Sequence, residues 1–196
     1  MFKFIGFYDY TVILTYTSLI SAVFGMINSV NGRFGVAIMC LFISGICDAF
    51  DGKVARSKKN RTDDEKAFGI QIDSLCDCVS FGVFPALLCY CMGADGTLGI
   101  ILVAVYSLCA VIRLAFFNVI EGKRQQTEGG ANKVYRGLPV TSISIVFPIV
   151  YCIGRPMKED VFTVLLCIML AVVAFLFVFD FEFKKPCLKG ILHNEK

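Results

Sequence analysis

Charged residues, histidine and tryptophan are scarce in this chain of 196 residues. Charged side chains make up only 18% of the sequence and hydrophobic residues 57%, a balance that a soluble core of this size does not need. The sequence has no Trp, and we expect no role for its single histidine, His193. A cleavable signal peptide is not expected, because the first apolar run is short and is followed by Asp9. We therefore predict an integral membrane protein.

Metal-binding cysteine spacings are also lacking, although the chain contains ten cysteines. None of them forms a C-x-x-C pair, and nearly all lie within apolar stretches. This pattern disfavours a metal site or a disulfide framework. It favours small, polarizable packing residues in a reducing environment.

Long apolar stretches are abundant. A bilayer core requires about 20 apolar residues per helix, and the sequence has six stretches of roughly this kind. They cover residues 11–30, 34–54, 68–92, 98–120, 138–154 and 160–181. We predict an all-α, polytopic protein with six transmembrane helices in a single membrane domain, residues 1–196. Residues 1–10 are expected to lie at the interface and residues 182–196 to form a cytoplasmic tail. Pro148 predicts a kink in the fifth span.

The distribution of Lys and Arg tests this topology. Fifteen of them fall on one side of the six predicted spans and three on the other, with Arg113 inside the fourth span. Cytoplasmic segments are enriched in Lys and Arg, so both termini are predicted to be cytoplasmic. A model with five or seven spans would distribute these Lys and Arg residues over both sides of the membrane.

Four aspartates lie near the cytoplasmic ends of the second and third spans. Asp48 and Asp51 are three residues apart, and Asp73 and Asp77 are four apart. On helices, each pair projects from one face, about one turn apart. The two spans are joined by one loop and can run antiparallel side by side, so the four carboxylates can converge.

Converging carboxylates in a membrane require cations, because each buried acid costs at least about 2.5 kcal/mol. Four carboxylates can hold two Mg²⁺ or Mn²⁺ ions, which prefer oxygen ligands and leave positions for phosphate. Two such ions suit phosphoryl transfer. The nearby glycines, Gly52 and Gly69, would let a phosphate or a second backbone approach closely. The alternative is that the aspartates are helix-end residues, solvated or paired with Lys and Arg.

These residues form a longer motif, Asp48-x-x-Asp51-Gly52-x-x-Ala55-Arg56 followed by Gly69-x-x-x-Asp73-x-x-x-Asp77. It resembles the signature of the CDP-alcohol phosphotransferase family, in which six transmembrane helices, commonly dimerised, hold a di-metal site at the cytoplasmic surface. There, an alcohol displaces CMP from a CDP-linked donor. The sequence departs from the usual pattern by a longer gap between Arg56 and Gly69, which predicts a lengthened cytoplasmic loop.

The resemblance implies roles for the residues of the motif. Its four aspartates would ligate two divalent ions, Mg²⁺ or Mn²⁺, and Asp77 would also be the general base for the alcohol. The CDP pocket would be lined by Gly52, Ala55, Arg56 and Gly69. Arg56 could instead be a snorkelling anchor at the helix end.

Three further stretches resemble the phosphatidylserine synthase branch of the family: Ser80-Phe81-Gly82 with Pro85, Arg113-Leu114-Ala115-x-Phe117-Asn118, and Gly137-Leu138-Pro139. In many such synthases an Arg stands where this chain has Phe116. The carboxylate of serine requires a cation, and a guanidinium within an apolar span usually faces a polar cavity. The candidate serine-binding residues are therefore Arg113, Asn118 and Arg136. Arg113 could instead pair with one of the aspartates, and Arg136 could be a simple anchor.

The resemblance implies a homodimeric enzyme of the cell membrane with a cytoplasmic active site. It would transfer a phosphatidyl group from CDP-diacylglycerol to L-serine, releasing phosphatidylserine and CMP; no nucleic-acid partner is expected. An acceptor such as glycerol 3-phosphate or an inositol phosphate is the nearest alternative. A divalent-cation channel or transporter, in which the carboxylates form a permeation site, is a more distant one.

Overall fold

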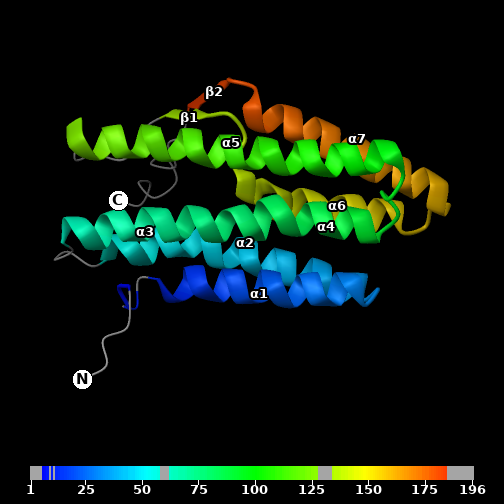
Figure 1. The fold of residues 1–196 in the computed structure, drawn as a ribbon, viewed down its shortest axis with the longest axis horizontal. Coiled ribbons are helices and arrows are strands. Elements are labelled where there is room, and N and C mark those ends of the chain that lie inside the picture. The colour runs from blue at the N-terminus through cyan, green and yellow to red at the C-terminus, as the bar shows by residue number, and fades with distance from the viewer. Residues whose placement is uncertain (1–5, 9, 11, 58–61, 128–133, 185–196) are drawn as a thin grey trace, which may run out of the picture.

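The computed structural model is a bundle of helices that run roughly along one axis (Figure 1). It describes residues 6–8, 10, 12–57, 62–127 and 134–184. The helices are α1 (Ile13–Val30), α2 (Phe34–Ser57), α3 (Asp63–Asp77), α4 (Phe84–Cys91), α5 (Thr97–Thr127), α6 (Ile143–Gly154) and α7 (Glu159–Val178). A π-helical segment, η1 (Cys78–Val83), joins α3 to α4, and a 3₁₀ turn, η2 (Val140–Ser142), precedes α6.

Five of the six predicted spans are long and apolar enough to cross a membrane. They are Ile13–Val30, Phe34–Gly52, Asp63–Cys91, Thr97–Ile120 and Glu159–Val178. The protein is therefore a multi-pass membrane protein by the length and composition of its helices. These five agree with the predicted spans to within a few residues.

The sixth predicted span, residues 138–154, differs from the expectation. Its α-helix, α6, has only 12 residues. The chain first turns at Gly137, whose φ of +66° suits glycine, and at Pro139 it is still extended. The first residues of the apolar stretch therefore form this turn and η2. As a result, α6 is shorter than the length needed to span a bilayer.

The connection between α5 and η2 contains a short strand. Helix α5 continues to Thr127, and residues 134–136 form a short strand, β1 (Val134–Arg136). This strand pairs antiparallel with β2 (Glu182–Lys184), with Tyr135 opposite Phe183. Within the described residues, the fold is therefore all-helical apart from this two-stranded ribbon, which ties the segment before α6 to the segment after α7.

The turns between helices gather at the ends of the bundle. The turns α1–α2, α4–α5 and α6–α7 lie together at one end, on the right of Figure 1, and the end of α5, the start of α3 and the two strands lie toward the other. Within residues 6–8 and 10, the described part of the predicted interfacial segment, the backbone is not helical. Phe7 packs there against Phe68 of α3, with ring centroids 5.4 Å apart.

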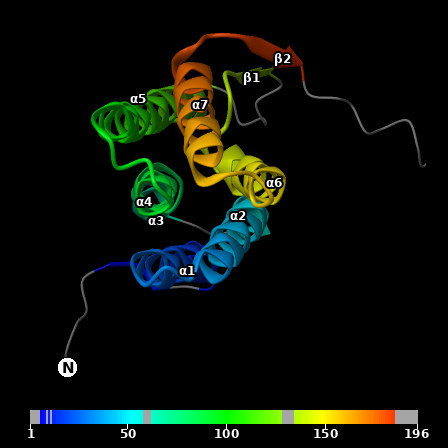
Figure 2. The same ribbon diagram turned by 90° about the vertical axis from the view of Figure 1, so that its right-hand side faces the viewer.

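The continuous helix α3–η1–α4 lies between α1 and α5 in the end-on view (Figure 2) and contacts both. Close packing at two points depends on glycine. A Cβ on Gly25 of α1 would collide with the Phe84 ring of α4, and one on Gly45 of α2 would collide with Ser144 of α6. Small residues of this kind allow membrane helices to approach closely. The carboxylates of α2 and α3 thus sit in a tightly packed framework.

Candidate active site

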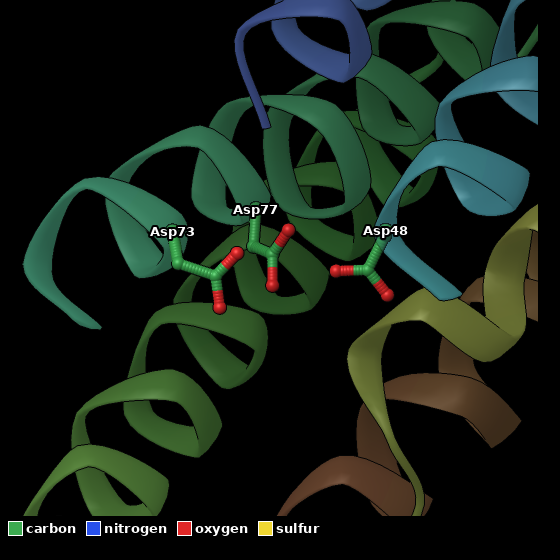
Figure 3. Close-up of side chains that lie close together, drawn as sticks. All are labelled: Asp48, Asp73 and Asp77. Atoms are coloured by element: carbon green, nitrogen blue, oxygen red, sulfur yellow. The ribbon is translucent and has the colours of Figure 1, made fainter. Parts of the chain in front are cut away.

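Three acidic side chains converge where α2 passes α3. Asp48 comes from α2, and Asp73 and Asp77 come from successive turns of α3, with their carboxyl groups directed toward one another (Figure 3). One carboxyl oxygen from each lies within 4.8 Å of the other two. Asp77 is buried, with 8% of its surface exposed. The helical spacing within α3 and the antiparallel course of α2 and α3 bring the acids together, as expected from the sequence.

Asp51, the fourth predicted ligand, lies beside this cluster. It is not one of the three residues whose oxygens group within 4.8 Å, yet its carboxyl group contacts that of Asp73, while Asp48 contacts Asp77. Asp51 is buried, and its Oδ2 accepts a hydrogen bond of 3.2 Å from the Thr15 hydroxyl of α1. The four acids thus form two touching pairs, one residue of each pair from α2 and one from α3.

This cluster fits divalent cations. Two oxygen ligands of one Mg²⁺ lie at most about 4.2 Å apart, since each bond is about 2.1 Å long, so a separation within 4.8 Å requires little adjustment. Among the described residues, the buried Oδ1 of Asp73 has no hydrogen-bond partner, which is costly unless another group binds it. Touching carboxylates repel one another unless they share a proton or a cation. Asp48, Asp51, Asp73 and Asp77 could therefore hold metal.

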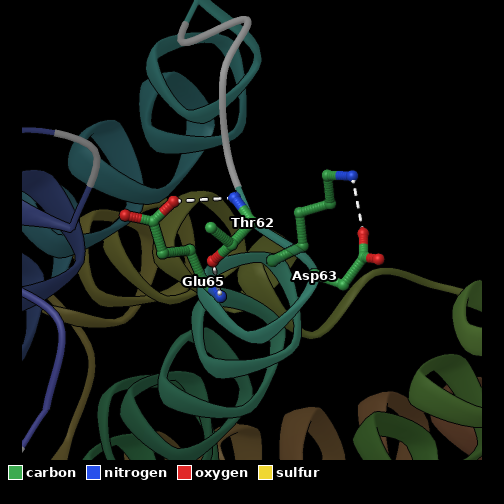
Figure 4. Close-up of polar contacts among 4 residues, drawn as sticks. Thr62, Asp63 and Glu65 are labelled. Atoms are coloured by element: carbon green, nitrogen blue, oxygen red, sulfur yellow. Dashed lines mark hydrogen bonds and ion pairs between the residues drawn. The ribbon is translucent and has the colours of Figure 1, made fainter.

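The start of α3 is fixed by a capping box. The Thr62 hydroxyl accepts a bond from the backbone N–H of Glu65, and the Glu65 carboxylate accepts one from the N–H of Thr62, at 3.2 and 2.8 Å (Figure 4). Lys66 also pairs with Asp63 at 3.0 Å.

The prediction of a lengthened loop between Arg56 and Gly69 is therefore wrong in part. Residues from Asp63 onward add a turn to the helix that carries Asp73 and Asp77. Asp63 and Asp64 are exposed, and Glu65 is half-buried.

A π-helical segment follows directly after Asp77. Such segments are rare and often occur at functional sites. In an α-helix the carbonyl of Phe81 would accept from residue 85, but that residue is Pro85, which has no N–H. Instead, the Tyr106 hydroxyl of α5 donates to the Phe81 carbonyl at 2.7 Å. Thus α5 supports the irregular turn that carries the chain away from Asp77.

Two of the predicted serine-binding residues, Asn118 and Arg113, lie on α5 and contact different parts of the protein. Asn118 lies against α3, where its Oδ1 accepts a 2.7 Å bond from the hydroxyl of Ser74. Arg113 is buried, and its Nε donates to the carbonyl of Leu138 at 3.1 Å. Asp180, after the end of α7, interacts with Arg113 electrostatically. Asn118 is thus beside the aspartates of α3, whereas Arg113 faces the turn before η2.

The predicted CDP-binding glycines follow the aspartates. Gly52 comes directly after Asp51 on α2, Gly69 lies one turn before Asp73 on α3, and both are half-buried. The side chains of Ala55, Arg56 and Arg136, which carry the remaining predicted contacts, lie outside the part of the chain that the structure describes.

Two features of the site were not predicted from the sequence. The π-helical segment has a signal, Pro85 within an otherwise helical apolar run, which removes one backbone donor. The contact of Thr15 with Asp51 has a weaker signal: Thr15, Ser18, Ala22 and Gly25 repeat at helical spacing, as small residues do at membrane helix interfaces.

Comparison with known proteins agrees with this geometry. The family model for CDP-alcohol phosphatidyltransferase matches residues 10–179, which is most of the chain. The chain belongs to the CDP-alcohol phosphatidyltransferase family. Enzymes of this family are typically metal-dependent, in keeping with the carboxylate cluster between α2 and α3.

Several relatives of this chain have names that include serine. It is 37% identical over 119 residues to CDP-diacylglycerol–serine O-phosphatidyltransferase of Saccharomyces cerevisiae, covering 59% of this chain and 42% of that protein. It is 34% identical over 127 residues to archaetidylserine synthase of Methanothermobacter thermautotrophicus, covering 64% and 50%. It is 34% identical over 121 residues to the Bacillus subtilis CDP-diacylglycerol–serine O-phosphatidyltransferase, covering 60% and 66%. These matches span between two-fifths and two-thirds of the relatives' lengths.

Proposed function

We propose that this phosphatidyltransferase moves a phosphatidyl group from CDP-diacylglycerol to the hydroxyl of L-serine, giving phosphatidylserine and CMP. The observation that carries the proposal is the convergence of Asp48, Asp73 and Asp77 within a chain of this family. Serine as the acceptor is supported by the names of the relatives, which include serine, at about 35% identity. The donor's acyl chains would lie in the bilayer and its diphosphate at the carboxylate cluster.

The carboxylates would act as follows. Asp48, Asp51, Asp73 and Asp77 would hold two divalent cations, which when bound would neutralise the diphosphate and favour in-line displacement. Asp77 accepts the proton of the serine hydroxyl as its oxygen attacks the phosphorus that bears diacylglycerol. A new P–O bond forms to serine, the P–O bond to CMP breaks, and CMP leaves with the electron pair. The burial of Asp77 excludes water, which would otherwise compete as the acceptor.

The residues of α5 and of the turn before η2 would orient the acceptor. Arg113 would face the serine carboxylate, since a guanidinium is the natural partner of that group. Its Nε bond to Leu138 fixes its position, and η2, which follows Leu138, contacts η1 beside Asp77. Asn118 and Arg136 would add a hydrogen bond and a charge. The CDP moiety would lie near Gly52, Ala55, Arg56 and Gly69.

The proposal also includes the location and assembly of the enzyme. Fifteen of the Lys and Arg residues lie on the side of the membrane to which both termini belong in the predicted topology. We expect this side to be cytoplasmic. The active site would then face the cytoplasm of a cell-membrane enzyme, and the chain would form a homodimer.

Acceptor identity is tested with purified protein, CDP-diacylglycerol and Mn²⁺ or Mg²⁺. CMP release is measured with L-serine, glycerol 3-phosphate and an inositol phosphate in parallel. We expect release with L-serine. Release only with glycerol 3-phosphate would remove serine from the proposal while leaving the chemistry intact.

The role of Asp77 is tested with Asp77→Asn. Asparagine keeps the shape of the side chain but cannot accept the proton, so we expect activity to fall by about 10²-fold or more, the range of a general base. Asp63→Asn, on the exposed first turn of α3, is the matched control and should retain activity. A fully active Asp77→Asn enzyme would overturn the base assignment.

A further inference from the structure

Helix α1 lies outside the motif that carries the aspartates, yet it contacts one of them through a buried hydrogen bond. The Thr15 hydroxyl donates to Oδ2 of Asp51 at 3.2 Å. Thr15 and Asp51 have exposed fractions of 5% and 7%. A hydrogen bond to a carboxylate in such surroundings is stronger than one between neutral groups.

We propose that Thr15 is a positioning residue for the metal site: its hydroxyl orients the carboxylate of Asp51 so that this group completes the cluster formed by the other three aspartates. This inference rests on the metal site of the proposed function. A carboxylate has about four lone-pair positions, so one donated hydrogen bond orients it and leaves positions for a cation. Asp51 needs such support because it stands beside, and not within, the group of three oxygen ligands.

A ladder of hydrogen bonds sets the register that places Thr15 opposite Asp51. Ser18 and Ser44 exchange bonds, each hydroxyl donating to the other residue's carbonyl, at 3.2 and 2.9 Å. One turn further along α1, the hydroxyl of Ser21 donates to the carbonyl of Cys40 at 2.9 Å. Side-chain bonds of this kind hold membrane helices together. Among these described contacts between α1 and α2, only the Thr15 bond ends on a carboxylate.

The structure offers two matched controls. Thr17 is the same residue type two positions away, but its hydroxyl bonds to the Ile13 carbonyl of its own helix. Ser18→Ala removes one bond of the ladder while the reciprocal bond from Ser44 remains. If Thr15 served only to pack α1 on α2, its loss would resemble the loss of Ser18.

The test measures Mn²⁺ binding to purified protein in detergent, without substrate, from the electron paramagnetic resonance signal of free Mn²⁺. Loss of a residue that orients a metal ligand typically lowers metal affinity 10- to 100-fold. We expect Thr15→Val and Thr15→Ala to weaken binding by about 10-fold or more. Thr15→Ser, which keeps the hydroxyl, should restore it, and Thr17→Val and Ser18→Ala should bind as the wild type does.

The same variants are assayed for CMP release across Mn²⁺ concentrations. The Mn²⁺ concentration for half-maximal rate should rise in Thr15→Val, with little change in the KM for serine. Wild-type affinity in Thr15→Val and Thr15→Ala, or an equal loss in Ser18→Ala, would overturn the positioning role. Failure of the wild-type protein to bind Mn²⁺ at all would instead overturn the metal site, and with it the proposed function.

Discussion

Replacing Tyr106 with Phe tests whether the π-helical segment after Asp77 depends on a donor from α5. The Tyr106 side chain is fully buried, and its hydroxyl donates to the Phe81 carbonyl at 2.7 Å. Phe keeps the ring, including its contact with the Phe177 ring at a centroid distance of 5.5 Å. The substitution therefore removes the hydrogen bond and little else. Pro85 cannot supply the missing donor.

The expected cost follows from the burial of the Tyr106–Phe81 hydrogen bond. Removing the donor of a buried hydrogen bond costs about 1–3 kcal/mol. For chains of 150–250 residues, each kcal/mol shifts the unfolding temperature by about 2–4 °C, so a loss of about 2 kcal/mol lowers it by about 4–8 °C. The assay is thermal unfolding in detergent. Ser107→Ala is the control, because its contact with the Gly82 carbonyl is long, at 3.5 Å. Unchanged unfolding of Tyr106→Phe would refute this reasoning.

Three other substitutions test the packing, the buried polar groups and the start of α3. Gly45→Ala should lower the free energy of unfolding by about 1–3 kcal/mol, because the added Cβ collides with Ser144; an unchanged denaturation midpoint would contradict the close contact. Ser80→Ala should leave thermal stability unchanged or raise it, because the buried Ser80 hydroxyl has no hydrogen-bond partner in the part of the chain that the structure describes; a marked loss would show that the hydroxyl is bonded. Thr62→Ala should cost about 0.5–2 kcal/mol through loss of the capping box, whereas Thr62→Ser should not.

Much of the helical framework could be predicted from the sequence. Apolar runs of spanning length leave few alternatives to a helix in a bilayer, so five spans are close to their predicted positions. The spacing of Asp73 and Asp77 placed both on one face of α3, and the short connection to α2 brought Asp48 within reach. The convergence of acids was therefore predictable from helical geometry.

The errors arise where the backbone departs from a regular helix. Residues 138–154 are apolar throughout, so hydrophobicity alone could not reveal that Gly137 and Pro139 delay the start of α6. The pairing of β1 with β2 joins segments almost fifty residues apart, and no local pattern indicates it. By contrast, the start of α3 had a readable signal, because Thr62 followed three residues later by Glu65 is a capping box.

The contacts of individual side chains were the least predictable part of the site. Arg113 was expected to face serine or an aspartate of the cluster, but its Nε donates to the Leu138 carbonyl, with Asp180 nearby. Asn118 was expected near the acceptor and lies against Ser74. Such pairings depend on the rotation of α5 about its own axis, which packing against several helices determines together.

The central claim, that the aspartates of α2 and α3 share bound divalent ions, is tested most directly by the stoichiometry of Mn²⁺ binding. Purified wild-type protein is titrated with Mn²⁺ in detergent and compared with Asp73→Asn, which alters the acid whose buried oxygen has no partner. We predict two ions per wild-type chain, magnetically coupled, and loss of at least one in Asp73→Asn. Equal binding by the two proteins, or no binding by either, would contradict a shared metal site.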